Sequence, residues 1–250
     1  MSIAKITRDF VSEIEEGKLF TYSDIPTSNK STVAIELSRL LKKGIIKKVS
    51  KGKFYKPKKR VFGEVGPSSN EKILSLLKST DGASYETGFN SFRKLGLTTQ
   101  VANEITIASS KQFKKVKIDN VNIKFVPRRV DVKEDEIYLV QILDALKDIK
   151  RIPATTPSEV VKYLKEIIKK ESLENQSKIT EFALKYTPRT RAILGALLKD
   201  IGNKKCAYEL KDSLNPISSY KINIDDEILK DKNYWNIKWH YIKMKSSMTL

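Results

Sequence analysis

The sequence predicts an α+β protein that is mainly helical, and three observations predict it. Apolar residues recur at the spacing of a buried helix face over most of the 250 residues. Two pairs of short extended segments, over 45–56 and 112–126, predict β-hairpins closed by tight turns at Lys51-Gly52 and Asp119-Asn120. Hydrophobic residues make up 40% of the chain, enough for buried cores, yet no run of 18 apolar residues occurs, so we expect no membrane span.

The first sixty residues carry a close series of short elements. In order, we expect a helix over 3–16, a short strand over 19–21, a helical turn at 24–25, a helix capped by Thr27 or Ser28 that ends at Gly44, and strands over 45–50 and 53–56. The buried face of the second long helix is marked by Val33, Leu37, Leu40 and Leu41, whereas Glu36 falls at a position that we expect to be exposed. This order is typical of a winged helix-turn-helix, which we predict for residues 1–60.

The remaining residues predict a second domain that combines a β-hairpin with helices. We expect a linker rich in Pro, Gly and Ser over 61–69, a C-terminal domain over 70–215 that is β-containing at 80–129 and helical at 134–214, and a tail over 216–250. Within the helical part, Thr156 to Glu159 predict a capping box with Pro157 at the first helical position. We also expect a helix over 178–186 and one that begins at Asp225.

Positive charge is concentrated in two stretches of the sequence. The net charge is +18, and residues 1–60 hold 15 Lys and Arg against 6 Asp and Glu. Residues 111–129 hold seven basic residues against one acidic residue. Clustered basicity is typical of proteins that bind a phosphate-rich partner, although a Lys-rich proteome would also give a basic protein.

The second long helix and the hairpin carry the candidate DNA contacts. The start of the second helix of a helix-turn-helix enters the major groove, where Asn29 suits an adenine edge and Lys30 a guanine edge. Arg39 lies further along and can reach a base or the backbone. The candidate DNA-binding residues are Ser28, Asn29, Lys30, Ser31, Thr32, Arg39, Lys42, Lys43, Lys47, Lys48, Lys51, Lys53, Tyr55 and Lys56. The alternative is a solvated helix face with capping residues at its start.

A second basic patch falls on the hairpin of the second domain. Its members are Lys114, Lys115, Lys117, Lys124, Arg128 and Arg129. These residues suit contact with DNA or with an acidic surface, but lysines also protect an edge strand from aggregation, and we favour that second interpretation. Tyr85, Phe89 and Phe92 are expected in the core rather than as a platform for stacked bases.

The sequence does not predict an enzyme. His240 is the single histidine and Cys206 the single cysteine, which excludes a His-based triad and a multi-His metal site. No glycine-rich phosphate loop occurs. We therefore expect no catalytic residues, no metal and no cofactor. A single cysteine also suits a reducing compartment, so we expect a cytoplasmic protein.

Several strings, in order, resemble the AbiEi-type antitoxin family. They are GKLFTYSDIPTSNKSTVAIELSRLLKKGIIKKVSKGKFYKPKK at 17–59, TGFNSFRKLGLTTQVANEITIAS at 87–109, NIKFVPRR at 122–129, VQILDALKDIKRIPATTP at 140–157 and YTPRTRAILGALL at 186–198. The resemblance covers about residues 15–200 and is weaker in the tail. It implies the antitoxin of a type IV toxin–antitoxin pair, a class associated with phage abortive infection.

The resemblance also implies partners. Its N-terminal domain would bind double-stranded DNA at inverted repeats of its own promoter and repress transcription, with self-association on the DNA. Its C-terminal domain would counter a nucleotidyltransferase-like toxin without a stable complex. The alternative is a winged-helix adaptor that binds RNA or the toxin and has no operator.

Overall fold

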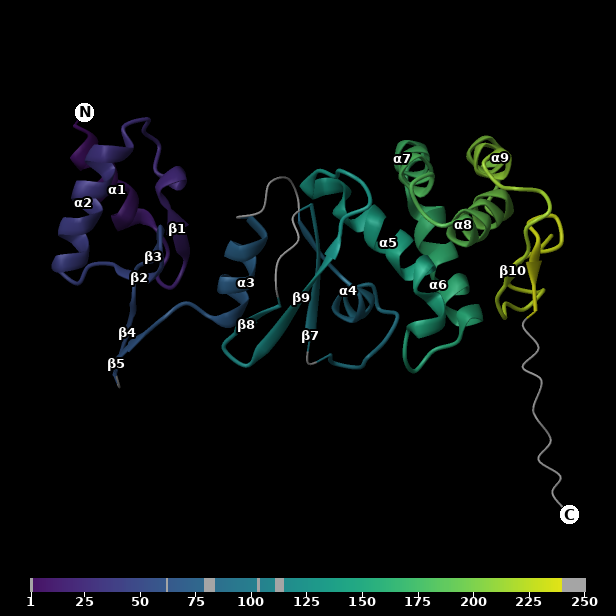
Figure 1. Ribbon diagram of the computed structural model, residues 1–250, viewed down its shortest axis with the longest axis horizontal. Coiled ribbons are helices and arrows are strands. Elements are labelled where there is room, and N and C mark those ends of the chain that lie inside the picture. Colours follow the sequence, from purple (N-terminus) through teal and green to yellow (C-terminus); the bar gives the residue numbers. More distant parts are fainter. Residues whose placement is uncertain (1, 62, 79–83, 103, 111–114, 240–250) are drawn as a thin grey trace, which may run out of the picture. The chain divides into compact units, whose positions relative to one another are not determined.

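The computed structural model describes residues 2–61, 63–78, 84–102, 104–110 and 115–239, and shows an α+β protein (Figure 1). The chain divides into two compact units. The first comprises residues 1–80 together with 117–121, and the second comprises 81–116 and 122–250. Within the described ranges, no helix combines the length and the apolar character needed to cross a membrane.

The first unit packs two helices and a small sheet around one core. Its elements are α1 (Ile3–Glu13), β1 (Leu19–Thr21), a 3-10 turn (Tyr22–Asp24), α2 (Lys30–Lys42), β2 (Lys47–Ser50) and β3 (Lys53–Tyr55), with the sheet in the order β1-β3-β2. The expected buried face of α2 is confirmed, because Val33, Leu37 and Leu40 are buried and Leu41 packs beside them. Phe20 and Phe54 pack against each other in the same core, on paired strands.

The expected linker over 61–69 contains regular structure. Strand β5 (Gly63–Val65) pairs antiparallel with β4 (Lys58–Arg60), and helix α3 (Ser69–Lys78) begins directly afterwards. Main-chain pairing forms this hairpin without a hydrophobic pattern, so the residue pattern alone did not predict it. Helix α3 is tied to β1, because Glu71 Oε1 accepts a hydrogen bond of 2.9 Å from the Leu19 amide.

Strands β6 (Tyr85–Thr87), β7 (Glu104–Ser109) and β9 (Val121–Pro127) of the second unit are neighbours in that order in one sheet, and the short helix α4 (Phe89–Lys94) follows β6. Strand β8 (Val116–Ile118) falls mostly within residues 117–121, which belong to the first unit. The expected turn at Asp119-Asn120 is present, with Asp119 at a φ of 52°. Part of the expected first hairpin strand, residues 111–114, lies outside the described residues. Strands β7 and β9 run parallel, which brings Thr106 beside Lys124.

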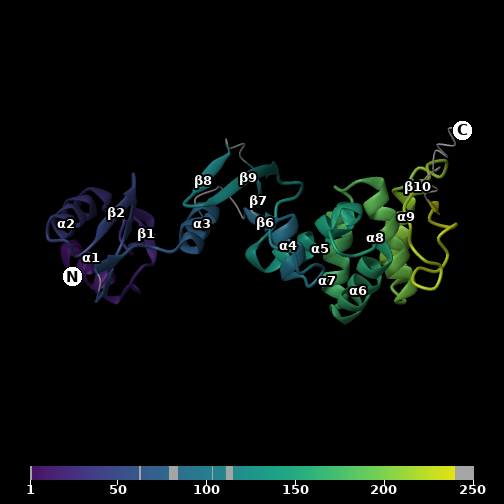
Figure 2. The same ribbon diagram turned by 90° about the horizontal axis from the view of Figure 1, so that it is seen from below.

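The helices of the second unit cluster beyond the sheet in both views (Figures 1 and 2). They are α5 (Ile137–Lys147), α6 (Pro157–Lys170), α7 (Leu173–Ala183), α8 (Pro188–Asp200) and α9 (Lys204–Asp212), with 3-10 turns at Glu134–Glu136 and Ile149–Arg151. The capping box of α6 is confirmed, with Glu159 bonded to the Thr156 amide at 2.7 Å. Helix α7 begins five residues before the expected Lys178, because Ser172 caps it by accepting from the Asn175 amide.

The expected tail is, up to residue 239, part of the core of the second unit. Strands β10 (Tyr220–Lys221) and β11 (Ile237–Lys238) pair in parallel. Trp235, two residues before β11, has a fully buried side chain. A Cβ added to Gly195 of α8 would lie 2.4 Å from the Trp235 ring, so the ring packs directly on the helix backbone. Asp225 starts an exposed turn rather than the expected helix. Residues 240–250 lie outside the described residues.

Candidate nucleic-acid interface

The start of α2 is fixed by a cap that differs from the expected one. Asn29, rather than Thr27 or Ser28, is the N-cap: its Oδ1 accepts from the Thr32 amide at 3.1 Å and from Ser31 Oγ at 2.8 Å. The Thr27 hydroxyl oxygen accepts from the Asn29 amide at 3.4 Å. This cap engages the side-chain oxygen of Asn29, Oδ1, whereas its side-chain nitrogen, Nδ2, has no partner among the described residues. Ser28, Lys30 and Ser31 are exposed.

Arg39 is held in place by the carboxylate of Glu36, whose burial the sequence did not predict. Glu36 was expected at an exposed position, but its side chain is only 5% exposed, because it lies between Val33 and Leu40 on the face that meets α1. Its two carboxylate oxygens bond to Arg8 at 3.0 Å and to Arg39 at 3.2 Å. The Arg39 side chain remains 66% exposed, so its other guanidinium donors face solvent.

Three of the candidate lysines of the hairpin are engaged with the protein. Lys47 pairs with Glu64 of β5 at 2.5 Å, and this hydrogen bond raises the pKa of Lys47. Lys53 donates to the Ser75 carbonyl at 3.2 Å, and burial lowers its pKa. Lys56 donates to the Ser12 carbonyl at 3.0 Å. These contacts hold the hairpin to its neighbours, so these lysines are poorer candidates for phosphate contacts.

A second set of candidates is exposed and unengaged. It comprises Lys30, Lys42, Lys43, Lys48 and Lys51, which are exposed and make no ion pair or side-chain hydrogen bond within the described part of the chain. They lie at both ends of α2 and on the β2–β3 hairpin. Tyr55 is half-buried at the end of β3. We call these five lysines the open lysines.

The expected second basic patch is divided by the structure. Lys115 and Lys117 are exposed on and beside β8, and Lys114 lies outside the described residues. Lys124, Arg128 and Arg129 instead line a cavity. Arg128 is largely buried and pairs with Asp131.

The described residues offer little for metal or thiol chemistry. No three His, Cys, Asp or Glu side chains lie together there as a metal site requires. Cys206 is buried in the core, with its sulfur 3.7 Å from Ser177 Oγ. His240 falls outside the described ranges.

Residues 5–176 match the model of a protein family of unknown function, DUF6088. The chain belongs to the DUF6088 family. Among solved structures, it is similar to the crystal structure of the RV2827C protein from Mycobacterium tuberculosis, with 12% sequence identity and a TM-score of 0.45 over 94% of this chain and 90% of that one. No curated protein matches it.

In this DUF6088 chain, a group of cations went unpredicted. Lys147 is the last residue of α5, Lys150 and Arg151 lie in the 3-10 turn after it, Lys185 precedes α8, and Arg189 lies in its first turn. All five line the same cavity. The strings KDIKR at 147–151 and KYTPR at 185–189 did show basic residues near helix ends, but no local pattern indicates that segments 38 residues apart in the sequence meet.

Proposed function

We propose that the chain is a DNA-binding repressor whose first unit docks on duplex DNA as a winged helix-turn-helix. In this proposal α2 is the recognition helix and the β2–β3 hairpin is the wing. The observation that carries it is the set of open lysines: cations on α2 and on the hairpin of one small unit face solvent with no acidic partner among the described residues. Phosphates of a duplex would neutralise these charges and release counterions.

The geometry narrows which residues would read bases. A bidentate contact to adenine needs both the donor and the acceptor of an Asn side chain, and the acceptor of Asn29 is engaged in the cap. Lys30, at the first position of α2, can reach the O6 and N7 acceptors of guanine without disturbing the cap. We therefore propose Lys30 as the main base contact, with Arg39 on the backbone.

Binding to the region upstream of its own operon tests this proposal. We expect specific binding that Lys30→Ala weakens by about 1–3 kcal/mol, with relaxed sequence preference. The double variant Lys48→Ala/Lys51→Ala removes two phosphate contacts, so the slope of log K against log salt should fall by about 1.8 for B-DNA. Lys162→Ala/Lys169→Ala, which removes two exposed lysines of α6, is the matched control. Equal affinity for a scrambled duplex at physiological salt contradicts the proposal.

We further propose that this repressor is the antitoxin of a type IV toxin–antitoxin pair. The support is the resemblance of the strings over about residues 15–200 to AbiEi-type antitoxins. The second unit would then counter a nucleotidyltransferase-like toxin without a stable complex. Cells that express such a toxin from the neighbouring gene should be rescued by the full chain.

A separation of the two roles tests the antitoxin proposal. Lys48→Ala/Lys51→Ala should release repression of the operon and keep toxin neutralisation, because neutralisation is assigned to the second unit. Loss of rescue in this variant contradicts that assignment. RNA that competes better than duplex DNA would instead favour an RNA-binding adaptor.

A further inference from the structure

The second unit contains a large cavity with a positively charged lining. Its volume is about 1390 Å³, and its walls come from strands β6, β7 and β9, helix α4, the end of α5 and the start of α8. Pockets for drug-sized ligands have volumes of about 300–1,000 Å³, so this cavity has room for a larger ligand. Every lining residue belongs to the second unit.

The lining carries an excess of cations. Among the described residues it holds eight Lys and Arg side chains against three carboxylates, which leaves five positive charges. The side chains of Lys124, Lys150 and Lys185 make no ion pair or hydrogen bond within the described part of the chain. Burial lowers the pKa of Lys150, and the nearby Arg189 lowers it further. An anion in the cavity would relieve this repulsion.

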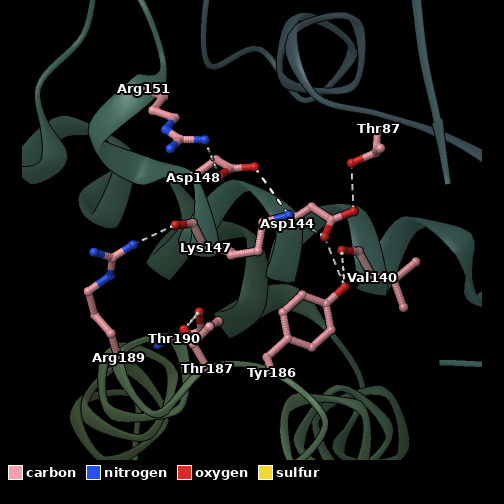
Figure 3. Close-up of polar contacts among 10 residues, drawn as sticks. All are labelled: Thr87, Val140, Asp144, Lys147, Asp148, Arg151, Tyr186, Thr187, Arg189 and Thr190. Atoms are coloured by element: carbon pink, nitrogen blue, oxygen red, sulfur yellow. Dashed lines mark hydrogen bonds and ion pairs between the residues drawn. The ribbon is translucent and has the colours of Figure 1, made fainter. Parts of the chain in front are cut away.

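A buried polar network organises the cavity wall (Figure 3). Asp144 of α5 accepts from Thr87 Oγ1 at 2.6 Å and from the Tyr186 hydroxyl at 3.0 Å. Lys147 Nζ lies 3.6 Å from Asp144 Oδ1 and 3.2 Å from Asp148 Oδ2. The network joins the sheet, α5 and the loop before α8. These hydrogen bonds and ion pairs hold in place the segments that carry the cavity's cations.

Arg189, which is bonded to this network, has a buried donor without a partner among the described residues. Its terminal nitrogen donates to the Lys147 carbonyl at 2.9 Å, as Figure 3 shows. Its Nε is buried and has no hydrogen-bond partner in the described structure. A buried donor without a partner is costly, and an anionic oxygen in the cavity is the kind of group that would satisfy it.

An aromatic ring is available at the cavity as well. Phe89 lines it and is 44% exposed, whereas the sequence predicted a core position. The Phe92 ring packs edge-on against it, with the centroids 6.3 Å apart. Tyr85 and Phe92 are buried, as expected. An exposed ring and cations without a partner among the described residues line the same cavity, a combination that suits a base and its phosphate.

We propose that this cavity binds a nucleotide unit, either free or at the end of a single strand. Lys124, Lys150, Lys185 and Arg189 would hold the phosphate, and Phe89 would stack on the base. The large volume and the exposed ring favour a nucleotide over an inorganic anion or an acidic peptide. This site goes beyond the proposed repressor function and does not depend on DNA binding by the first unit.

Binding measurements on the full-length chain test the proposal. The probes are inorganic phosphate, adenosine 5′-monophosphate, and a 5′-phosphorylated single strand of four nucleotides beside its dephosphorylated form. We expect saturable binding of the mononucleotide or of the phosphorylated strand, and which of them binds more tightly distinguishes the two sources. Phosphate alone should bind more weakly than either.

Variants assign the binding to the cavity. Lys150→Ala/Lys185→Ala should weaken it by about tenfold or more, because each exposed lysine loses a charge-assisted contact. Phe89→Leu should weaken nucleotide binding by about fivefold or more and leave phosphate binding unchanged. Lys162→Ala/Lys169→Ala and Lys48→Ala/Lys51→Ala should bind as the parent chain does. Unchanged thermal unfolding of each variant shows that folding is intact.

Four results overturn the proposal. They are the absence of saturable binding by every probe, an equal loss in the Lys162/Lys169 control, unchanged binding in Lys150→Ala/Lys185→Ala, and competition by a polyglutamate peptide as effective as competition by the nucleotide. None of these results bears on duplex binding by the first unit, so the proposed repressor function stands or fails separately.

Discussion

The two units present positive charge in contrasting ways. In the first, the open lysines project from the ends of α2 and from a hairpin, over a small core that includes Phe20 and Phe54. In the second, cations line a cavity whose wall is held by the buried Asp144 network, beside a far larger core. Projecting, unengaged lysines suit rows of phosphates on a duplex, whereas converging cations suit a single phosphate group. Arrangement, rather than the amount of charge, therefore separates the expected ligands.

The largest effect is expected on the stability of the second unit, from a substitution in its core. Trp235→Ala removes a fully buried ring that packs on Gly195, so we expect a loss of about 3–5 kcal/mol in the free energy of unfolding of that unit. Thermal unfolding measures it, and duplex binding below the transition should be unchanged. Trp239→Ala, at a position 45% exposed, is the control, with an expected change within about 0.5 kcal/mol. A loss in Trp235→Ala no larger than that of the control would show that the Trp235 ring does not stabilise the core of the second unit.

A smaller effect is expected at the buried carboxylate of the first unit. Glu36→Ala removes two charge-assisted hydrogen bonds, but both arginine partners are exposed to water, so we expect a loss of about 1–2 kcal/mol. Amide hydrogen exchange in α2 reports this loss for the first unit. Glu13→Ala, at an exposed position of α1, should change little. Unaltered protection in Glu36→Ala would mean that the triad with Arg8 and Arg39 does not stabilise the unit.

The smallest expected effect concerns Lys47, which is not one of the open lysines because it is paired with Glu64. Glu64→Gln releases Lys47, so we expect a modest gain in duplex affinity by fluorescence anisotropy. The Lys47 hydrogen bond lowers the pKa of Glu64 from 4.5 and raises that of Lys47 from 10.5. The pair is therefore lost only as pH falls through the lowered pKa of Glu64 or rises through the raised pKa of Lys47.

The gain in Glu64→Gln should consequently be constant between about pH 6 and pH 9. Glu15→Gln removes one exposed negative charge elsewhere in the first unit and serves as the control. A gain that varies across this window, or an equal gain in the control, would contradict the role assigned to the Lys47–Glu64 pair.

Local signals in the sequence predicted the parts of the fold that depend on neighbouring residues. The α2 stripe and the Thr156–Glu159 capping box were predicted because each is set within one or two helical turns. The burial of Trp235 depends on Gly195, forty residues earlier, and no local pattern indicates that pairing. Glu36 was misplaced for a similar reason, since its partner Arg8 lies on another helix.

The two candidate sites also differ in how far local signals in the sequence predict them. The exposed positions of the open lysines followed from helix and hairpin periodicity alone. The cavity required Lys124, Lys150 and Lys185 to converge from a strand and two loops, which is a property of the tertiary structure. Asn29 shows an intermediate case, because its type predicts both a cap and a base contact, and the geometry decides for the cap.

If the two basic surfaces bind different ligands, substitutions in one surface must leave binding at the other unchanged, and one crossed binding experiment measures this. Affinities for the operator duplex and for the nucleotide probe are measured with the parent chain, Lys48→Ala/Lys51→Ala and Lys150→Ala/Lys185→Ala, at the same salt concentration. We expect the first pair to weaken only duplex binding and the second pair to weaken only nucleotide binding. Equal weakening of both ligands by either pair would contradict it.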